Sequence, residues 1–328
     1  MTAFTRGSTM KLGLMLQVGE GALEAGATAR WPDLREMATV AEDVGFNTLF
    51  VPDHLLFRRS PEDNLLQVEM PEGRTRGAWE AWTLLSAMAE ATSRIQLGPF
   101  VACNSFRNPA LLAKMAVTLD EVSDGRLVLG IGAGWHEPEY HAFGFPFDHR
   151  VGRLEEALQI LVPLLREGAV DFQGQYYRAR DCEIVPRGPR ENGPPILIGA
   201  QRPRMMRLAA RYADIFDTDF HLDTADVVAR FELAEQACRD IGRDPGSLTR
   251  AAATTVAVTP DSASGQGGLT TRTLEGMVRE LYAGTVEELI EFASGFQRAG
   301  AELLTLTLVD PPGARGIEQL AALVEHFD

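Results

Sequence analysis

The sequence predicts a (β/α)8 TIM barrel, an α/β fold built as a single domain over residues 1–328. Eight short apolar runs have the length and boundaries of buried strands, and segments with helical spacing separate nearly all of them. Strands that alternate with helices form a parallel sheet. A chain of 328 residues has the usual length of one such barrel. A doubly wound open sheet is the alternative fold.

The eight expected strands share an apolar core with a glycine, proline or polar turn signal at their ends. They cover residues 11–17, 46–51, 95–102, 127–131, 195–199, 214–218, 248–259 and 303–308. The first expected helix begins near Pro32 and ends at Gly45, because proline suits a first helical turn and glycine a C-cap.

The other expected helices show apolar residues at three- and four-residue spacing. They cover residues 79–91, 109–124, 154–161, 204–213, 224–241, 274–282, 285–299 and 317–327. Asn108 before Pro109 is the expected N-cap of the second of these. Pro163 is expected to kink or shorten the helix that begins near Leu154.

Three segments break the alternation and are expected to be loop insertions. They cover about residues 57–77, 169–194 and 260–273. The first is polar and carries two prolines, the second suggests a hairpin around Gly174, and the third is rich in serine and glycine and is expected to be mobile. Residues 1–9 lack an apolar core and are expected to be a disordered leader.

The composition narrows the class of protein. A formal net charge of −15 argues against a nucleic-acid groove or an anionic membrane surface as partner. Cys103, Cys182 and Cys238 are odd in number and widely spaced, which fits neither a disulfide framework nor a CxxC metal site. No run reaches the length of a transmembrane helix. A cytoplasmic protein that acts on a small molecule is expected.

Asp53 and His54 follow the second expected strand directly. Val51 is biased to an extended conformation by Pro52, and Pro52 cannot continue regular pairing, so the two side chains lie where the strand becomes a loop. In a TIM barrel the loops after the strands share one mouth, where ligands bind. Asp53 and His54 are therefore candidate site residues.

Three further strand ends carry unusual sequence. They are residues 98–104, 130–136 and 199–202. Glycine at a strand end lets the backbone approach a flat or phosphorylated ligand closely. The run from Gly130 to Gly134 lacks the third glycine of a dinucleotide fingerprint, so it is a weak signal for that fold. Gly199-Ala200 precedes a helix that has Arg202 at its start. Backbone N–H groups at such a helix start can bind phosphate, so this turn is a candidate phosphate site.

The same stretches resemble the bacterial luciferase-like superfamily, in particular its branch of oxidoreductases dependent on the deazaflavin coenzyme F420. The similarity runs from Lys11 to about Asp214 and resumes near residues 284–308. The similarity is strongest in residues 45–54, 94–109, 124–144 and 194–213. The Asp53-His54 pair is the feature that indicates the F420 branch.

The resemblance implies a TIM barrel with the ring system of the coenzyme in its mouth. It also implies a non-prolyl cis peptide bond after the third strand, at Phe100-Val101, that backs the ring. His54 matches the catalytic histidine of the family and Asp53 the acid beside it. Cys103 stands where a small hydroxyl residue often contacts the ring.

The resemblance assigns further residues to coenzyme binding. The loop after the fourth strand contributes Gly132, Gly134, Trp135, His136 and Tyr140, and at least one of its last three side chains is expected to touch the ring or the ribityl chain. The phosphate loop of the family matches Gly199, Ala200, Gln201 and Arg202. Gln201-Arg202 replaces a more usual pair of small residues, although an arginine suits an anion.

The function that follows is hydride transfer between the deazaflavin and a small organic substrate. His54 exchanges the substrate proton or stabilises charge on the reduced ring, Asp53 orients or tunes the imidazole, and Gln17 is a weaker candidate for the same pocket. The family often forms dimers, so a homodimer is expected. The resemblance does not fix the substrate or the direction of transfer.

Three other functions remain open from the sequence. The first is an FMN-dependent monooxygenase of the same superfamily. The second is a metal-dependent hydrolase on a TIM barrel, in which His54 and Asp53 act as ligands with His221 and Asp219. The third is a relative that binds flavin without catalysis. No bound metal is expected under the favoured function.

Overall fold

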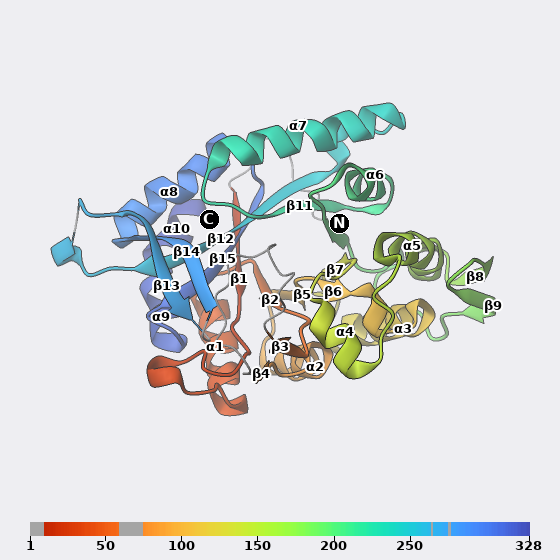
Figure 1. Cartoon of the computed structure of the whole chain (residues 1–328), viewed down its shortest axis with the longest axis horizontal. Coiled ribbons are helices and arrows are strands. Elements are labelled where there is room, and N and C mark those ends of the chain that lie inside the picture. The colour runs from red at the N-terminus through yellow and green to blue at the C-terminus, as the bar shows by residue number, and fades with distance from the viewer. Residues whose placement is uncertain (1–9, 59–74, 264, 275–276) are drawn as a thin grey trace.

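The computed structural model describes residues 10–58, 75–263, 265–274 and 277–328 (Figure 1). The expected leader, residues 1–9, lies outside the described residues. Most of the expected insertion at 57–77 also does. Its two ends are described as the short antiparallel strands β3 (Leu56–Arg58) and β4 (Thr75–Gly77).

The central sheet is a parallel barrel, as the sequence predicts. Its strands, in chain order, are β1 (Lys11–Met15), β2 (Thr48–Val51), β5 (Gln96–Pro99) with β6 (Ala102–Cys103), β7 (Leu129–Gly132), β10 (Ile196–Gly199), β11 (Ile215–Phe220), β12 (Thr249–Val258) and β15 (Leu303–Asp310). β1 pairs with both β2 and β15, which places Leu14 between Leu49 and Leu306. The barrel closes where Leu97 bridges Leu127 and β6 pairs with β7.

The helices surround the barrel (Figure 1). They are α1 (Trp31–Val44), α2 (Ala81–Ala91), α3 (Pro109–Val122), α4 (Glu137–Phe143), α5 (Arg150–Arg166), α6 (Pro203–Tyr212), α7 (Thr224–Asp240), α8 (Val286–Arg298), α9 (Ala314–Gln319) and α10 (Ala321–Phe327). The expected cap at Asn108 is confirmed, because its side chain accepts from Ala110 N and Leu111 N. No helix among the described residues is long and apolar enough to cross a membrane.

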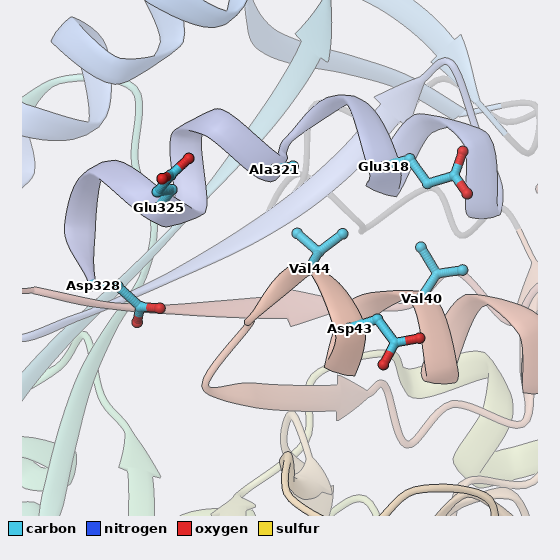
Figure 2. Close-up of a pocket in the computed structure, with 7 residues that line it drawn as sticks. All are labelled: Val40, Asp43, Val44, Glu318, Ala321, Glu325 and Asp328. Atoms are coloured by element: carbon cyan, nitrogen blue, oxygen red, sulfur yellow. The ribbon is translucent and has the colours of Figure 1, made fainter.

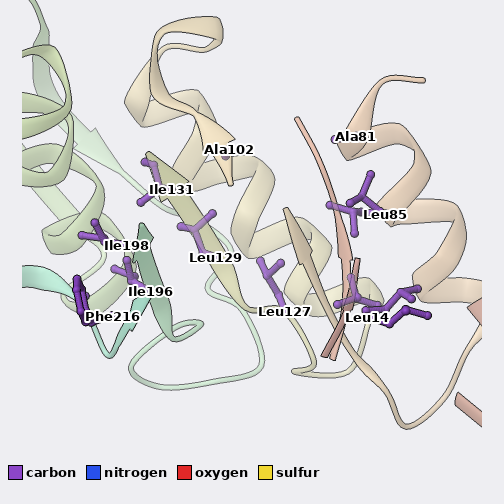
Figure 3. Close-up of a cluster of buried hydrophobic side chains, with 14 of the residues drawn as sticks. Leu14, Ala81, Leu85, Ala102, Leu127, Leu129, Ile131, Ile196, Ile198 and Phe216 are labelled. Atoms are coloured by element: carbon purple, nitrogen blue, oxygen red, sulfur yellow. The ribbon is translucent and has the colours of Figure 1, made fainter. Parts of the chain in front are cut away.

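Apolar side chains pack on both faces of the barrel wall. Successive residues of each strand point alternately into the barrel and out toward the helices. Figure 3 shows one side, where Leu129, Ile131 and Ile198 belong to the main buried cluster with Leu85 of α2. Phe50 and Leu303 belong to a smaller cluster within the barrel, against which Phe100 and Phe220 pack.

The expected helix at 274–282 is wrong. This segment belongs to an antiparallel hairpin of β13 (Gly268–Leu274) and β14 (Met277–Gly284), and β14 also pairs with the end of β12. Residues 268–273 of the expected loop insertion at 260–273 also lie in β13, so this part is a strand and not a loop. Pairing with β12 stabilises a strand that the local apolar spacing does not reveal.

Pro163 does not shorten its helix, since α5 continues to Arg166. The proline removes one backbone donor, but Leu161, Leu164 and Leu165 are buried on both sides of it and hold the last turn in place. The insertion at 169–194 does contain the expected hairpin, formed by β8 (Ala169–Gln173) and β9 (Arg178–Glu183).

A surface groove between α1 and the C-terminal helices lies at the opposite end of the barrel from Asp53 and His54. It is lined by Val40, Val44 and Ala321 and by four carboxylic acids, Asp43, Glu318, Glu325 and Asp328 (Figure 2). Val44 ends α1 just before β2 begins, so the groove lies at the amino ends of the strands.

Candidate functional site

His54 lies just after β2 and is held by a carboxylate of α4, the helix that follows β7. Its Nδ1 lies 3.0 Å from Oε1 of Glu139 in α4, and Oε2 of the same carboxylate accepts the Leu55 backbone N–H at 2.9 Å. Glu139 is buried, with 2% of its surface exposed. A buried acceptor with two donors fixes the position of the imidazole at the carboxyl end of the barrel.

Asp53 has different partners. Arg107 donates to both of its oxygens, at 2.6 and 3.0 Å, and the Cys103 backbone N–H donates to Oδ2 at 2.9 Å. Arg107 also donates to Glu80, at 2.7 Å. Among the described residues no hydrogen bond joins Asp53 to His54, so Asp53 does not orient the imidazole by direct contact. Adjacent residues of an extended chain point in opposite directions, and Glu139 takes the place beside the imidazole.

Three aromatic rings surround the His54 imidazole or its neighbours. The His54 ring centroid lies 4.5 Å from that of Phe57 and 5.3 Å from that of Trp135, and His136 packs against both aromatic residues. His136 is buried, and its Nε2 accepts the Arg58 backbone N–H at 3.1 Å. Trp135 is half-buried, so of the expected ring contacts in this loop it is the one most open to the mouth.

Tyr140 and Cys103 form a buried pair below this loop. The Tyr140 hydroxyl donates to the Ala133 carbonyl at 2.8 Å and lies 2.9 Å from Cys103 Sγ. Burial raises the pKa of the Cys103 thiol to about 12, and burial also raises the pKa of Tyr140. Tyr140 is fully buried, so it supports the loop from beneath and does not face the mouth.

Gly134 is required by this packing, and its replacement is expected to damage the site. A Cβ on Gly134 would lie 1.8 Å from the Tyr140 hydroxyl oxygen, and its φ is +74°. Gly134→Ala is expected to lower the free energy of unfolding by about 2 kcal/mol or more in urea denaturation. Gly144→Ala is the matched control, because Gly144 has φ +76° with no atom within 4 Å of a Cβ. Equal losses in both variants would contradict the prediction.

The peptide bond between Phe100 and Val101 is cis, which confirms that expectation. The Phe100 ring lies 5.0 Å from Phe50 and 6.2 Å from Phe220. A Cβ on Gly132 would lie 2.7 Å from a Val101 methyl carbon, so this glycine makes room for the valine. The close approach at Gly132 is thus between β7 and the bend at Val101 that joins β5 to β6.

The expected phosphate loop lies at the carboxyl end of β10. Gly199 has no atom within 4 Å of a built Cβ, so the backbone is open there. The Ala200 N–H donates to the Asp217 carbonyl at 3.0 Å, and Arg202 is an exposed N-cap of α6. The Gln201 side-chain amide donates to Asp219, so it is engaged by a carboxylate in this structure.

Asp217 lies on the inward face of β11 and is an unusual buried acid. Its Oδ1 accepts the Asp219 N–H at 2.7 Å, and only 1% of the residue is exposed. Burial raises the pKa of the Asp217 carboxyl to about 8, a rise that the Asp219 N–H opposes and the Asp219 charge increases. The folded protein thus keeps this carboxyl protonated at neutral pH.

Asp217 is expected to make stability depend on pH. An unfolded aspartate ionises near pH 4. The folded state therefore binds the extra proton between about pH 4 and pH 8, and this stabilisation is lost as pH rises through that window. Relative to wild type, Asp217→Asn should gain up to about 1.4 kcal/mol of unfolding free energy per pH unit there. Urea denaturation at several pH values checks this, and a difference that does not change with pH would contradict it.

The residues that the metal-dependent hydrolase alternative would use as ligands do not form one cluster. Asp53 binds Arg107, His54 contacts Glu139, and His221 Nε2 lies 2.9 Å from the Thr218 carbonyl oxygen. Within the described part of the chain, no group of three or more His, Cys, Asp or Glu side chains has an arrangement suited to a metal ion.

Sequence reasoning missed Glu139, Arg107 and Phe57 as parts of this site. Glu139 lies in α4, a short helix within the expected aromatic loop, although Pro138 near its start and Gly144 at its end are helix signals. Gln17, the weaker candidate, donates to the Leu308 carbonyl at 2.7 Å.

A model of the luciferase-like monooxygenase family matches residues 10–304. The chain belongs to this family. Its F420-branch resemblance has support in a relative from Amycolatopsis mediterranei described as an F420-dependent glucose-6-phosphate dehydrogenase, which is 34% identical over 209 residues. That alignment covers 62% of this chain and 57% of the relative.

Two further proteins are similar to this chain. A pyrimidine monooxygenase RutA from a Bradyrhizobium species is 34% identical over 51% of this chain and 48% of its own length. The chain thus spans about half the length of the curated relatives it matches. A solved F420-dependent secondary alcohol dehydrogenase, in complex with an F420-acetone adduct, has TM-score 0.77 at 20% identity and covers 98% of this chain and 99% of its own. This likeness supports the barrel fold.

Proposed function

We propose that the chain is an oxidoreductase that uses coenzyme F420 to transfer a hydride to or from a small organic substrate. The observation that carries the proposal is a histidine at the barrel mouth, His54, that is held by the buried Glu139 and packed by the rings of Phe57 and Trp135. The 34% identity with an F420-dependent dehydrogenase adds support.

The described residues fit a flat, anionic coenzyme. The backbone at Gly199 is open, and the exposed Arg202 beside it provides a positive charge for a phosphate. Trp135 is half-buried next to His54 and offers an aromatic surface at the mouth. In this proposal residues 199–202 hold the phosphate, Phe100, Val101, Cys103 and Trp135 border the ring, and Gln201 exchanges its bond to Asp219 for the ligand.

In this mechanism the deazaflavin supplies the hydride chemistry when bound. The protein positions the substrate and moves a proton at His54 Nε2, the ring nitrogen opposite the one that Glu139 holds. Asp53 has a structural role. Its hydrogen bonds to Arg107 and to the Cys103 backbone N–H connect β6 to the end of β2. The aromatic rings of Phe57 and Trp135 limit the access of water to the imidazole.

Titration of the purified protein with F420 and, separately, with FMN tests the proposal. Both compounds are fluorescent, so binding is followed directly. We expect a saturable change with F420 and a much weaker response to FMN. Tight FMN binding without F420 binding would overturn the proposal and favour the alternative below.

The alternative is an FMN-dependent monooxygenase of the same family. The identity with the pyrimidine monooxygenase favours it, and so does the family description. Under this alternative, the same mouth holds FMN, and turnover consumes oxygen. If the purified protein itself binds either compound but never turns over, it is a non-catalytic relative.

We also propose that the chain is one barrel domain that works as a homodimer in the cytoplasm. Leu111 and Val122 on α3 are exposed apolar side chains, with 55% and 47% of their surfaces accessible. A second copy that covers α3 would remove them from water. Analytical ultracentrifugation is expected to give a dimer, and a monomer at micromolar concentration would contradict this part.

A further inference from the structure

We infer that Glu139 fixes the His54 imidazole as the tautomer with its proton on Nδ1, so that Nε2 presents a lone pair at the barrel mouth. Glu139 is then a positioning residue for the reaction. The inference deepens the proposed function and rests on it for its catalytic meaning, but the tautomer itself can be measured without coenzyme or substrate.

The two oxygens of Glu139 receive two different donors. Oε2 lies 2.9 Å from the Leu55 backbone nitrogen, which can only donate. Oε1 lies 3.0 Å from His54 Nδ1. A carboxylate only accepts hydrogen bonds, so Nδ1 must carry a proton to complete the pair. The network thus assigns the tautomer.

Nε2 has a different environment. No hydrogen bond joins it to any residue that the structure describes, whereas Phe57 and Trp135 pack around the ring at 4.5 and 5.3 Å. These contacts restrict ring rotation, and the bond at Nδ1 sets which edge points outward. In its neutral form the imidazole therefore has its acceptor at Nε2, which can take a proton from a substrate hydroxyl or amine.

Glutamine at position 139 is expected to reverse this arrangement. Its side chain has the same shape but only one acceptor oxygen. The Leu55 N–H is fixed in the backbone and requires that oxygen, which turns the amide NH2 toward His54 Nδ1. Nδ1 must then be the acceptor, and the proton moves to Nε2. A nearly isosteric change thus converts the mouth-facing nitrogen from acceptor to donor.

The same helix provides a matched control. Glu137 and His141 form an exposed pair on α4, with Oε1 and Nε2 3.1 Å apart. Glu137→Gln changes the same chemistry two residues from Glu139 but outside the mouth. It is expected to leave the His54 tautomer and turnover unchanged.

The test is ¹⁵N NMR of the full chain with labelled histidine rings, at a mildly alkaline pH where imidazoles are neutral. His54→Gln assigns the His54 signals by their loss. In wild type and in Glu137→Gln we expect His54 to have a proton on Nδ1 and none on Nε2. In Glu139→Gln we expect the proton on Nε2 and none on Nδ1. A wild-type His54 protonated on Nε2, or an unchanged tautomer in Glu139→Gln, would overturn the inference; the wild-type spectrum decides even if the variant fails to fold.

Kinetics provide a second readout once a substrate is known. Glu139→Gln should lower kcat about 10- to 100-fold, with F420 affinity nearly unchanged, by comparison with carboxylates that orient metal-bound histidines. Because the NMR measurement uses no coenzyme, failure of F420 to bind would refute the proposed function and leave the tautomer result standing. A normal kcat in an active Glu139→Gln enzyme with a reversed tautomer would refute the positioning role alone.

Discussion

His54→Ala is expected to reduce turnover by about 10²- to 10⁴-fold, the usual contribution of a positioned general acid–base. In the proposed mechanism the imidazole carries the proton, and Glu139, Phe57 and Trp135 contact it. Coenzyme affinity should stay within an order of magnitude, since the proposed phosphate loop begins at Gly199, at the end of another strand. Steady-state turnover and F420 titration on the same preparation measure both effects.

His141→Ala is the matched control for this prediction. It removes an imidazole that also contacts a glutamate, but on the exposed side of α4. Turnover should stay at the wild-type level in this control. Normal turnover in His54→Ala would show that the histidine has no catalytic role, whereas loss of coenzyme binding together with turnover would show that it acts mainly in binding.

Arg107→Ala is expected to reduce the free energy of unfolding by about 3–5 kcal/mol, because it leaves a buried carboxylate without its cation. The Arg107 side chain is 10% exposed and that of Asp53 only 1%. Two hydrogen bonds join them, and a third joins Arg107 to Glu80. Urea denaturation followed by circular dichroism measures the loss.

Arg298→Ala provides the comparison at the surface. Its ion pair with Glu291 is 2.8 Å long, but both side chains are more than half exposed, so the expected loss is below about 1 kcal/mol. If Arg107→Ala were no more destabilising than Arg298→Ala, the Asp53 carboxylate would not depend on its arginine. The structural role assigned to Asp53 would then be wrong.

The barrel was predictable because its signals are local. Apolar runs, the Asn108 cap and the Gly45 stop each fix an element from a few neighbouring residues, and the order of elements then determines a parallel sheet. The prediction of a helix at 274–282 was wrong for the opposite reason. There β14 pairs with both β12 and β13, and the spacing of the residues in the segment does not show these pairings.

The site was predictable only in part. The place of His54 at a strand end followed from the local sequence, and the cis bond at Phe100-Val101 from a family resemblance carried by short motifs. Their partners lie far along the chain, since Glu139 is 85 residues from His54 and Arg107 is 54 residues from Asp53. Only the closed barrel brings such pairs together, so no local pattern could assign the carboxylate beside the imidazole.

A crystal structure of the protein with bound F420 tests the central claim most directly. The account predicts the deazaflavin ring against Phe100-Val101, with His54 Nε2 beside it and a phosphate at residues 199–202. A coenzyme bound elsewhere on the barrel, or a ring separated from His54 by the barrel wall, would contradict it.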